Sequence, residues 1–303
     1  MVSRVTVEKW HENEKTWWDS YGAYMSYQWR LTPRLNKILR SKLGQNYTEF
    51  LVKEGDKLLD LGCGSGWLSL YFANFRMHVL GLDLSQEQIN EANKLKLNRN
   101  NINLKFLCTD FIHWDLKGYK AKFDKVFVNA FLHHLPDVEL EMVLKKIAFV
   151  LKPGGKVFMY EPLTSSCQSS SFVLRVFDNA VERFSGFFIN KFPDWFSLYS
   201  SEYKIAIKSG YIMNSPHERP VDISLIEKFC RKNFEIIEVK GYHLYSLGFA
   251  MQSMNLKIFF REIYSIITVI LYMFDKLFLS IFGWRKFSRP QRFILCSIKL
   301  IRK

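Results

Sequence analysis

The sequence predicts an α/β fold in which a mainly parallel β-sheet carries helices on both faces. From residue 57 onward, short apolar segments alternate with longer helical segments, which is typical of such sheets. The apolar segments are rich in Leu, Val, Ile and Phe, and each is closed by turn-forming or acidic residues. With 303 residues, of which 48% are hydrophobic, the chain can bury a substantial core.

The composition excludes several classes of protein. A content of 8 Pro and 15 Gly, with 16% aromatic residues, argues against a disordered, collagen-like or low-complexity chain. The five cysteines are odd in number and form no Cys-x-x-Cys pair, which argues against a disulfide framework and a zinc cluster. We therefore expect a globular protein of a reducing cytoplasm that binds no metal ion.

The chain is strongly basic, with 43 Lys and Arg residues against 29 Asp and Glu residues and a formal net charge of +14. Nucleic acids, anionic membranes and acidic small molecules are all compatible partners for this charge. Residues 1–18 alternate acidic and basic side chains and lack an apolar segment, so we expect no secretory signal.

The core of the predicted sheet lies within residues 51–163. Helices are expected at 85–98 and 138–151, and Ser85 and Gln88 have the spacing of a capping box at the start of the first helix. Five strands are expected, at residues 57–61, 78–83, 103–109, 125–129 and 156–161.

Three further segments surround this core. Residues 1–50 are rich in Trp and Tyr at helical spacing and are expected to form an aromatic helical lid, although such a face can also simply pack on the sheet. Residues 164–222 begin with a Ser-rich stretch and continue into an aromatic segment, which indicates an inserted helical cap. Residues 223–303 are expected to complete the sheet, with a helix at 223–232, strands at 234–242 and 293–301, and a basic apolar helical insertion at about 251–288.

The strongest motif connects the first strand to a helix through a glycine-rich turn, Asp60-Leu61-Gly62-Cys63-Gly64-Ser65-Gly66. Glycines permit positive φ angles and a close approach of ligand to backbone, and the helix start offers free amides. In a dinucleotide-binding fingerprint the third glycine comes one residue later and no acid is required before the first. The carboxylate of Asp60 suits a cationic group better than a pyrophosphate.

Acidic residues also close the next two strands. Asp83, followed by Leu84, lies 17 residues after Gly66, where a carboxylate can accept both hydroxyls of a ribose. The third strand ends in Thr109-Asp110-Phe111, which offers a carboxylate for an exocyclic amine and an aromatic face for a purine. Three successive strand ends therefore carry groups suited to a nucleoside.

In this order and spacing, the motifs resemble those of class I S-adenosylmethionine-dependent methyltransferases. The resemblance extends to Phe-Asp-Lys-Val-Phe-Val-Asn at 123–129 and Leu-Lys-Pro-Gly-Gly at 151–155. It implies a Rossmann-like seven-stranded sheet and S-adenosylmethionine as the cofactor; a hydride-transfer enzyme is the main rival on this fold. The cofactor-binding residues that it implies are Asp60, Gly62, Cys63, Gly64, Ser65, Gly66, Asp83, Leu84, Thr109, Asp110, Phe111, Asn129 and Ala130.

The candidate catalytic residues are His133, His134, His217 and Glu161, with His243 as a further histidine to weigh. Methyl transfer requires alignment of the nucleophile and, for some acceptors, removal of a proton. We favour His133, because it follows the fourth strand, at the edge where open α/β sheets bind ligands. Two alternatives stay open: the paired histidines position the backbone of the turn, and Glu161 is a solvated residue at the sheet rim.

The C-terminal segment contains ten of the basic residues and only two acids within residues 251–303, a net charge of +8. Its apolar residues are expected in two pieces, 263–274 and 277–284, each shorter than the ~20 residues of a membrane-spanning helix. Two interpretations remain, a buried helical cap over the pocket and an interfacial helix whose basic residues meet anionic headgroups. The basic residues are Arg285, Lys286, Arg289 and Arg292.

Together these features favour methyl transfer from S-adenosylmethionine to oxygen, nitrogen or carbon of a small hydrophobic or lipid-like acceptor. An RNA methyltransferase and a non-catalytic, cofactor-binding protein of the membrane surface are the alternatives. Asn129 is followed by Ala130 and Phe131 rather than by Pro-Pro and an aromatic residue, which disfavours methylation of base amines and makes nucleic acid an unfavoured partner. We expect a cytoplasmic location, with an anionic membrane surface as the second partner that the sequence admits.

Overall fold

The computed structural model describes the central sheet, four helices against it, an N-terminal helix and one long peripheral helix. Of the predicted lid, residues 4–22 are described; of the predicted cap, only residues 164, 217 and 219–222 are; His243 lies outside the described residues. The described residues are 4–22, 52–97, 103–164, 217, 219–231, 233–241, 257–282 and 293–300.

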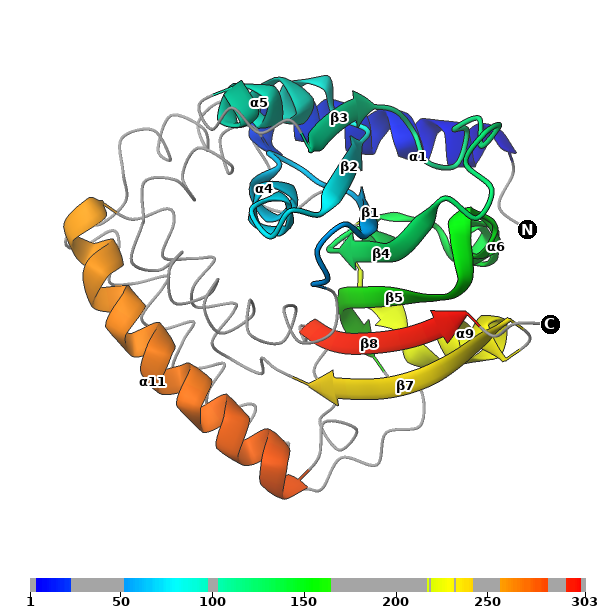
Figure 1. Cartoon of the computed structure of the whole chain (residues 1–303). Coiled ribbons are helices and arrows are strands. Elements are labelled where there is room, and N and C mark those ends of the chain that lie inside the picture. The colour runs from blue at the N-terminus through cyan, green and yellow to red at the C-terminus, as the bar shows by residue number, and fades with distance from the viewer. Residues whose placement is uncertain are drawn as a thin grey trace.

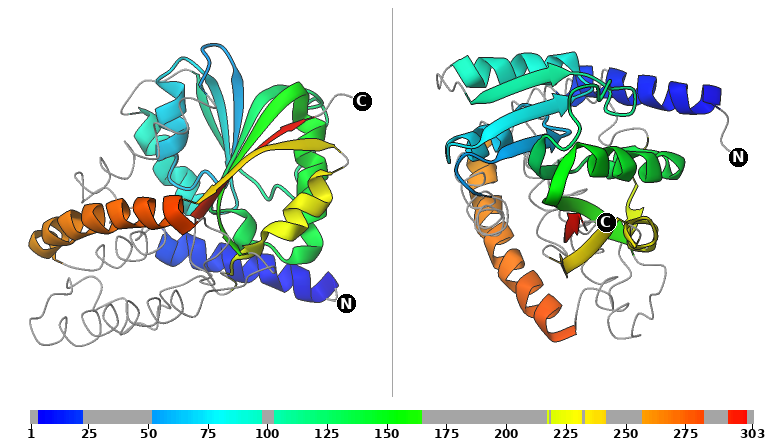
Figure 2. Two further views of the ribbon diagram at one scale, coloured as in Figure 1. Left: turned by 90° about the horizontal axis from the view of Figure 1, so that it is seen from below. Right: turned by 45° about the vertical axis from the view of Figure 1, so that its right-hand side comes forward.

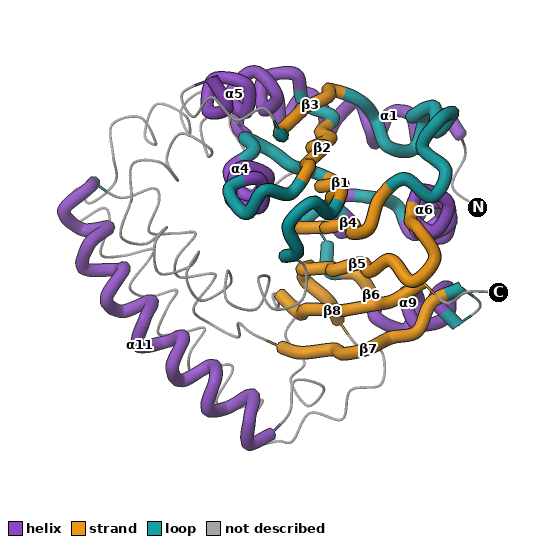
Figure 3. The backbone as a smooth tube through the Cα atoms, in the orientation of Figure 1, coloured by secondary structure: helices purple, strands orange, loops and turns teal. Residues whose placement is uncertain are grey.

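The sheet has the strand order β3-β2-β1-β4-β5-β8-β7 (Figure 1). The first five strands in this order are parallel, and β8 runs antiparallel to both β5 and β7. Among the described residues, seven strands follow this path, and the two-residue β6 (Val221–Asp222) pairs with the end of β5 as an eighth strand off the path (Figure 3). The other strands are β1 (Lys57–Leu61), β2 (His78–Asp83), β3 (Leu104–Cys108), β4 (Phe123–Asn129), β5 (Leu151–Thr164), β7 (Phe234–Gly241) and β8 (Phe293–Leu300).

Helices pack on both faces of the sheet (Figure 2). α4 (Trp67–Ala73) and α5 (Gln86–Leu97) cover one face, where a core cluster includes Leu58, Phe72 and Phe127. α6 (Asp137–Val150) and α9 (Ile223–Cys230) cover the other, over a larger cluster. Ser85 Oγ accepts a hydrogen bond from the Gln88 amide at 3.2 Å, which confirms the predicted cap at the start of α5.

β5 begins five residues before its predicted start. Leu151 pairs with Phe123 of β4, and the register then shifts before Lys125 pairs with Lys156. The Pro153-Gly154-Gly155 segment, which has the composition of a turn, therefore lies inside the strand as an irregularity, with Gly154 at φ +76°.

Two helices lie outside these layers. α1 (Arg4–Trp17) continues into a short π-helical segment, η1 (Trp18–Gly22), and contacts residues at the carboxyl ends of the parallel strands. α11 (Ile258–Phe282) runs along the margin of the molecule in Figures 1 and 2. It is one continuous helix of 25 residues, so the prediction of two shorter pieces was wrong.

Candidate active site

The glycine-rich turn after β1 is tightly packed. Gly62, Gly64 and Gly66 have φ angles of +68°, +51° and +76°, in a region that residues other than glycine rarely adopt. A Cβ at Gly62 would lie 3.0 Å from the Cβ of Phe131, and one at Gly66 would lie 2.4 Å from Cζ of Phe106. Gly66 also begins α4 without a side-chain cap. The turn, which the sequence predicted to contact a cofactor, therefore requires glycine both for its backbone conformation and for its packing on Phe131 and Phe106.

Asp83, at the end of β2, connects this turn to the next one. Its Oδ2 accepts a hydrogen bond from the Gly64 amide at 2.8 Å, and its Oδ1 accepts one from the Ser85 amide at 2.9 Å. Loss of water around the carboxylate raises the pKa of Asp83, against the effect of the two amides. Because a carboxylate can accept about four hydrogen bonds, both oxygens retain capacity for ribose hydroxyls.

Asp60 and Cys63 lie beneath the turn. The Asp60 carboxylate is 1% exposed and accepts a hydrogen bond from the Ser69 hydroxyl of α4 at 2.5 Å. Burial raises the pKa of Asp60 to about 7. The sulfur of Cys63 is also buried, 2.9 Å from where a Cβ at Gly81 would lie, and burial raises its thiol pKa. In this arrangement the side chains of Asp60 and Cys63 are buried beside the glycine-rich turn and stabilise it by packing.

The residues that follow β3 differ from expectation. Asp110 is held by three protein groups: the Ile112 amide at 2.8 Å, His113 Nδ1 at 2.7 Å and His11 Nδ1 at 3.2 Å. Although burial opposes it, these contacts lower the pKa of Asp110 to about 2. Phe111, predicted to offer an aromatic face to a purine, is only 3% exposed and packs in the core. Its expected role as an exposed stacking surface is therefore wrong for this arrangement.

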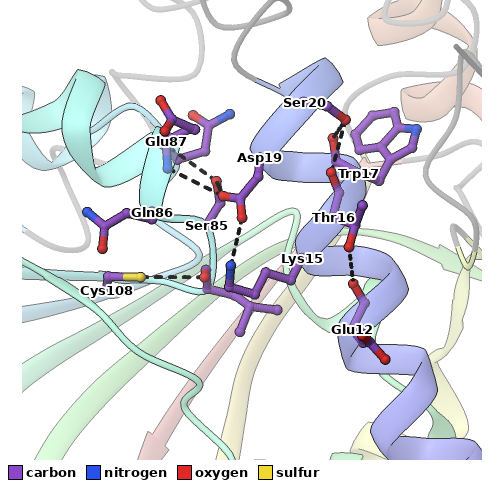
Figure 4. Close-up of polar contacts among 12 residues, drawn as sticks. Glu12, Lys15, Thr16, Trp17, Asp19, Ser20, Ser85, Gln86, Glu87 and Cys108 are labelled. Carbon is purple, nitrogen blue, oxygen red and sulfur yellow. Dashed lines mark hydrogen bonds and ion pairs between the residues drawn. The ribbon is translucent and has the colours of Figure 1, made fainter.

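The N-terminal helix closes over this end of the sheet. Nε2 of His11 lies 2.8 Å from Glu139 Oε2 of α6, and its contact with Asp110, followed by that with Glu139, raises the pKa of His11 to about 10. In η1, Asp19 accepts hydrogen bonds from the Ser85 hydroxyl at 2.6 Å and the Glu87 amide at 3.3 Å. Asp19 also forms an ion pair with Lys15 (Figure 4). α1 and η1 together thus connect the residues that follow β2 and β3 with the start of α6.

The turn between β4 and α6 is organised by one buried carboxylate. Glu161, on β5, is fully buried; its Oε1 accepts hydrogen bonds from the Phe131 and Leu132 amides at 2.8 and 3.0 Å. Its Oε2 lies 2.8 Å from Nδ1 of His133, which is itself 3% exposed. The alternative that Glu161 is a solvated rim residue is therefore wrong. Ala130, at φ +51°, makes the turn sharp enough for these contacts.

Three histidines and two carboxylates form a cluster next to this turn. The rings of His133 and His134 are 3.9 Å apart, and His134 Nδ1 lies 3.2 Å from Oε2 of the buried Glu14 of α1. Glu14 Oε1 accepts a hydrogen bond from the His217 amide at 3.1 Å. The His217 ring stacks on Trp10 with centroids 3.8 Å apart, and burial lowers its pKa. The structure therefore gathers all four residues that we named as catalytic candidates.

Sequence reasoning missed the polar residues of α1. His11 and Glu14 lie three residues apart, and Glu14 lies four residues after Trp10 of the predicted lid, which is the spacing that could have identified this face. Within the described segments, no group of three or more His, Cys, Asp or Glu residues is placed to hold a metal ion.

Residues 58–155 match a family model described as a methyltransferase domain. The matched segment contains the glycine turn, Asp83, Asp110 and the turn that carries His133. Residues 58–155 form a class I S-adenosylmethionine-dependent methyltransferase domain. The geometry of this methyltransferase domain fits its cofactor, since the crowded glycine turn leaves room only for backbone and Asp83 keeps free acceptor positions.

The methyltransferase domain has named relatives. The chain is 30% identical over 158 residues to a ubiquinone biosynthesis O-methyltransferase of Nitrobacter winogradskyi, over 51% of the chain and 58% of that protein. It is 26% identical over 223 residues to a protein of the same name from Bradyrhizobium sp., over 70% of the chain and 84% of that protein. The match to the Nitrobacter protein thus spans little more than half of that relative.

The fold of the methyltransferase domain also occurs in proteins with other reactions. The crystal structure of the cyclase SpnF has a TM-score of 0.52 with this chain at 16% identity, covering 86% of this chain and 80% of that one. Because that protein is described as a cyclase, the fold alone does not determine the reaction.

Proposed function

We propose that this protein transfers a methyl group from S-adenosylmethionine to an oxygen of a small, lipid-like acceptor, with His133 as the general base. The observation that carries the proposal is the buried pair of His133 and Glu161 at the edge that holds the glycine turn. The turn that carries His133 is in direct contact with the glycine-rich turn, because Phe131, two residues before His133, packs on Gly62.

The pair is suited to removing a proton. With Glu161 ionised, the N–H at Nδ1 of His133 donates a hydrogen bond to Oε2, which leaves Nε2 as the basic nitrogen. When that nitrogen takes the acceptor's proton, the adjacent carboxylate stabilises the imidazolium. When bound, S-adenosylmethionine supplies the activated methyl group. Glu161 is a positioning residue in this scheme, because it acts on the acceptor only through His133.

The acceptor class is inferred from relatives and charge. The relatives named ubiquinone biosynthesis O-methyltransferases support an oxygen acceptor that is hydrophobic. The net charge of +14 favours an enzyme that works at an anionic membrane surface, where such an acceptor would reside, and the proposed location is the cytoplasmic side of that surface. A small hydrophobic molecule is therefore the proposed substrate and the membrane surface the second proposed partner.

The test uses methyl-labelled S-adenosylmethionine with three acceptors: a prenylated catechol, an unprenylated catechol and total RNA. We expect label in the prenylated product, equimolar S-adenosylhomocysteine, and loss of both in His133→Ala. Label in RNA would replace the proposal with an RNA methyltransferase. Cofactor binding without transfer to any acceptor would instead favour a non-catalytic role.

A further inference from the structure

α11 is an amphipathic helix whose buried face carries polar side chains and whose exposed face is apolar. Four of its polar side chains face inward, with exposed fractions between 0% and 2% for Arg261, Ser265, Thr268 and Asp275. Ser265 donates a hydrogen bond to the Arg261 carbonyl at 2.7 Å, and Arg261, Thr268 and Asp275 each interact with other residues of the protein. These residues recur at spacings of three, four and seven, so they form one stripe.

The opposite face is apolar and open. Nine large hydrophobic side chains are between 36% and 71% exposed, and at 3.6 residues per turn they fall within about a third of the helix circumference. A contiguous apolar face of this kind marks an interaction site. The nine residues are Phe259, Ile263, Ile266, Ile267, Ile270, Met273, Phe274, Leu277 and Ile281.

By length and composition alone, residues 259–281 could cross a bilayer, with a mean hydropathy of 1.6 and 18% of the helix window buried. The topology excludes a single crossing of the bilayer by α11. The segments on either side of α11 lead to strands that are hydrogen-bonded to each other, with Gly241 of β7 paired to Ile294 of β8, so both ends of the helix must lie on the same side. A return would need a second span of ~20 residues, and the flanking segments 242–257 and 283–292 are both shorter. The helix must therefore stay on one side of a membrane.

We propose that the apolar face of α11 docks this protein parallel to the surface of an anionic lipid bilayer. The charge of the adjacent sequence supports lipid as the occupant: residues 283–292 contain four basic residues and no acid. Basic residues next to an apolar helix face are the combination that binds anionic headgroups. A second copy of the chain is a poorer fit, because two chains of net charge +14 repel each other.

This inference rests on the proposed function, because docking to a membrane would bring the protein to a lipid-like acceptor dissolved there. The test of docking measures vesicle binding and does not require methyl transfer. The full chain is floated with vesicles of phosphatidylcholine alone and of equal parts phosphatidylcholine and phosphatidylglycerol. We expect binding to the anionic vesicles, weakened when salt rises from about 0.1 M to about 1 M, where screening shortens the Debye length.

The decisive variant is Ile266→Glu with Ile270→Glu, and the matched control is Leu97→Glu, another exposed apolar residue, 78% exposed at the end of α5. The double variant should lose vesicle affinity by about tenfold or more, equivalent to about 1.4 kcal/mol, whereas the control should not. Unchanged melting temperature and cofactor affinity show that both variants fold.

Three results would overturn the proposal: no flotation of the wild-type chain, equal flotation of the double variant, or light scattering that shows a wild-type dimer and a monomeric double variant. Failure of the proposed function has a different signature, because vesicle binding would then persist while no acceptor is methylated.

Discussion

His133 Nδ1 and Glu161 Oε2 lie 2.8 Å apart, with both side chains almost completely buried at the carboxyl edge of the sheet. The same carboxylate holds the backbone amides of Phe131 and Leu132. The pair therefore has two separable effects, since Glu161 supports the turn whereas His133 is the base of the proposed reaction.

We predict that His133→Ala lowers kcat by about 10²–10⁴-fold, the usual contribution of a general base, and leaves cofactor affinity within error. The measurement combines steady-state kinetics with calorimetric titration of S-adenosylmethionine. His78→Ala, an exposed histidine at the start of β2, serves as the control. Full activity in His133→Ala would return this residue to a purely structural role.

Glu161→Gln should behave differently from His133→Ala. The amide keeps the shape of the side chain but loses the charge that orients the imidazole, so kcat should fall and the free energy of unfolding should fall by about 1–3 kcal/mol. A variant that lost stability and kept the wild-type kcat and pH–rate profile would show that Glu161 supports the turn alone.

Asp83→Asn should weaken cofactor binding by about tenfold or more, because a hydrogen bond to a charged acceptor contributes about 1.5–3 kcal/mol. Asn retains one of the two oxygens that accept the Gly64 and Ser85 amides, so the fold should survive. Calorimetry checks the affinity. Asp56→Asn, which removes a carboxylate 3.7 Å from Lys125 at the other end of the strands, is the matched control and should bind normally.

Gly66→Ala should destabilise the domain by about 2–5 kcal/mol, since a left-handed φ costs about 1–2 kcal/mol and overpacking against Phe106 and Ala92 adds about 1–3 kcal/mol. Gly118 has a similar φ of +82° with nothing within 4 Å of an added Cβ. Gly118→Ala therefore isolates the backbone cost. Urea denaturation of both variants gives the comparison, and equal losses would contradict the packing argument.

The local pattern of apolar and turn-forming residues was sufficient to predict most strands of the sheet. The bounds of β1 and β2 agree with the predicted ranges, because each is a short apolar run closed by a turn. The start of β5 was wrong because Pro153 and two glycines have turn composition, and only pairing with β4 keeps them in the strand. α11 was divided at Asp275 because a charge normally ends an apolar face, whereas here the carboxylate is buried on the inward face.

The candidate site was predicted only in part, for a related reason. Residues that follow strand ends are brought together by the parallel sheet itself, so His133, Glu161 and Asp83 could be named from spacing. The partners His11 and Glu14 come from α1, about one hundred residues or more before Asp110 and His134, and their contacts depend on docking that no local pattern encodes. Phe111 was assigned to the ligand because sequence position does not reveal which side of a turn is buried.

The docking of α1 should depend on pH through His11. Its pKa is raised to about 10 in the folded protein from an ordinary value of 6.5, so its contribution to stability is complete below about pH 6.5 and is lost as the pH rises towards 10. The pKa of Asp110 is lowered to about 2 from 3.8, so its contribution is complete above about pH 4 and is lost as the pH falls towards 2. The pair should stabilise the fold most between about pH 4 and 6.5.

His11→Gln should therefore lower the free energy of unfolding by about 1–2 kcal/mol near pH 5.5, between the values for exposed and buried ion pairs. The difference from wild type should shrink steadily above pH 6.5 and be nearly absent above about pH 10, where the wild-type imidazole loses its proton in the folded state as well as in the unfolded state. Urea denaturation across this range measures it, with His78→Gln as the control. A pH-independent difference would mean that His11 stabilises α1 by packing rather than by its charge, and that the contacts with Asp110 and Glu139 contribute little.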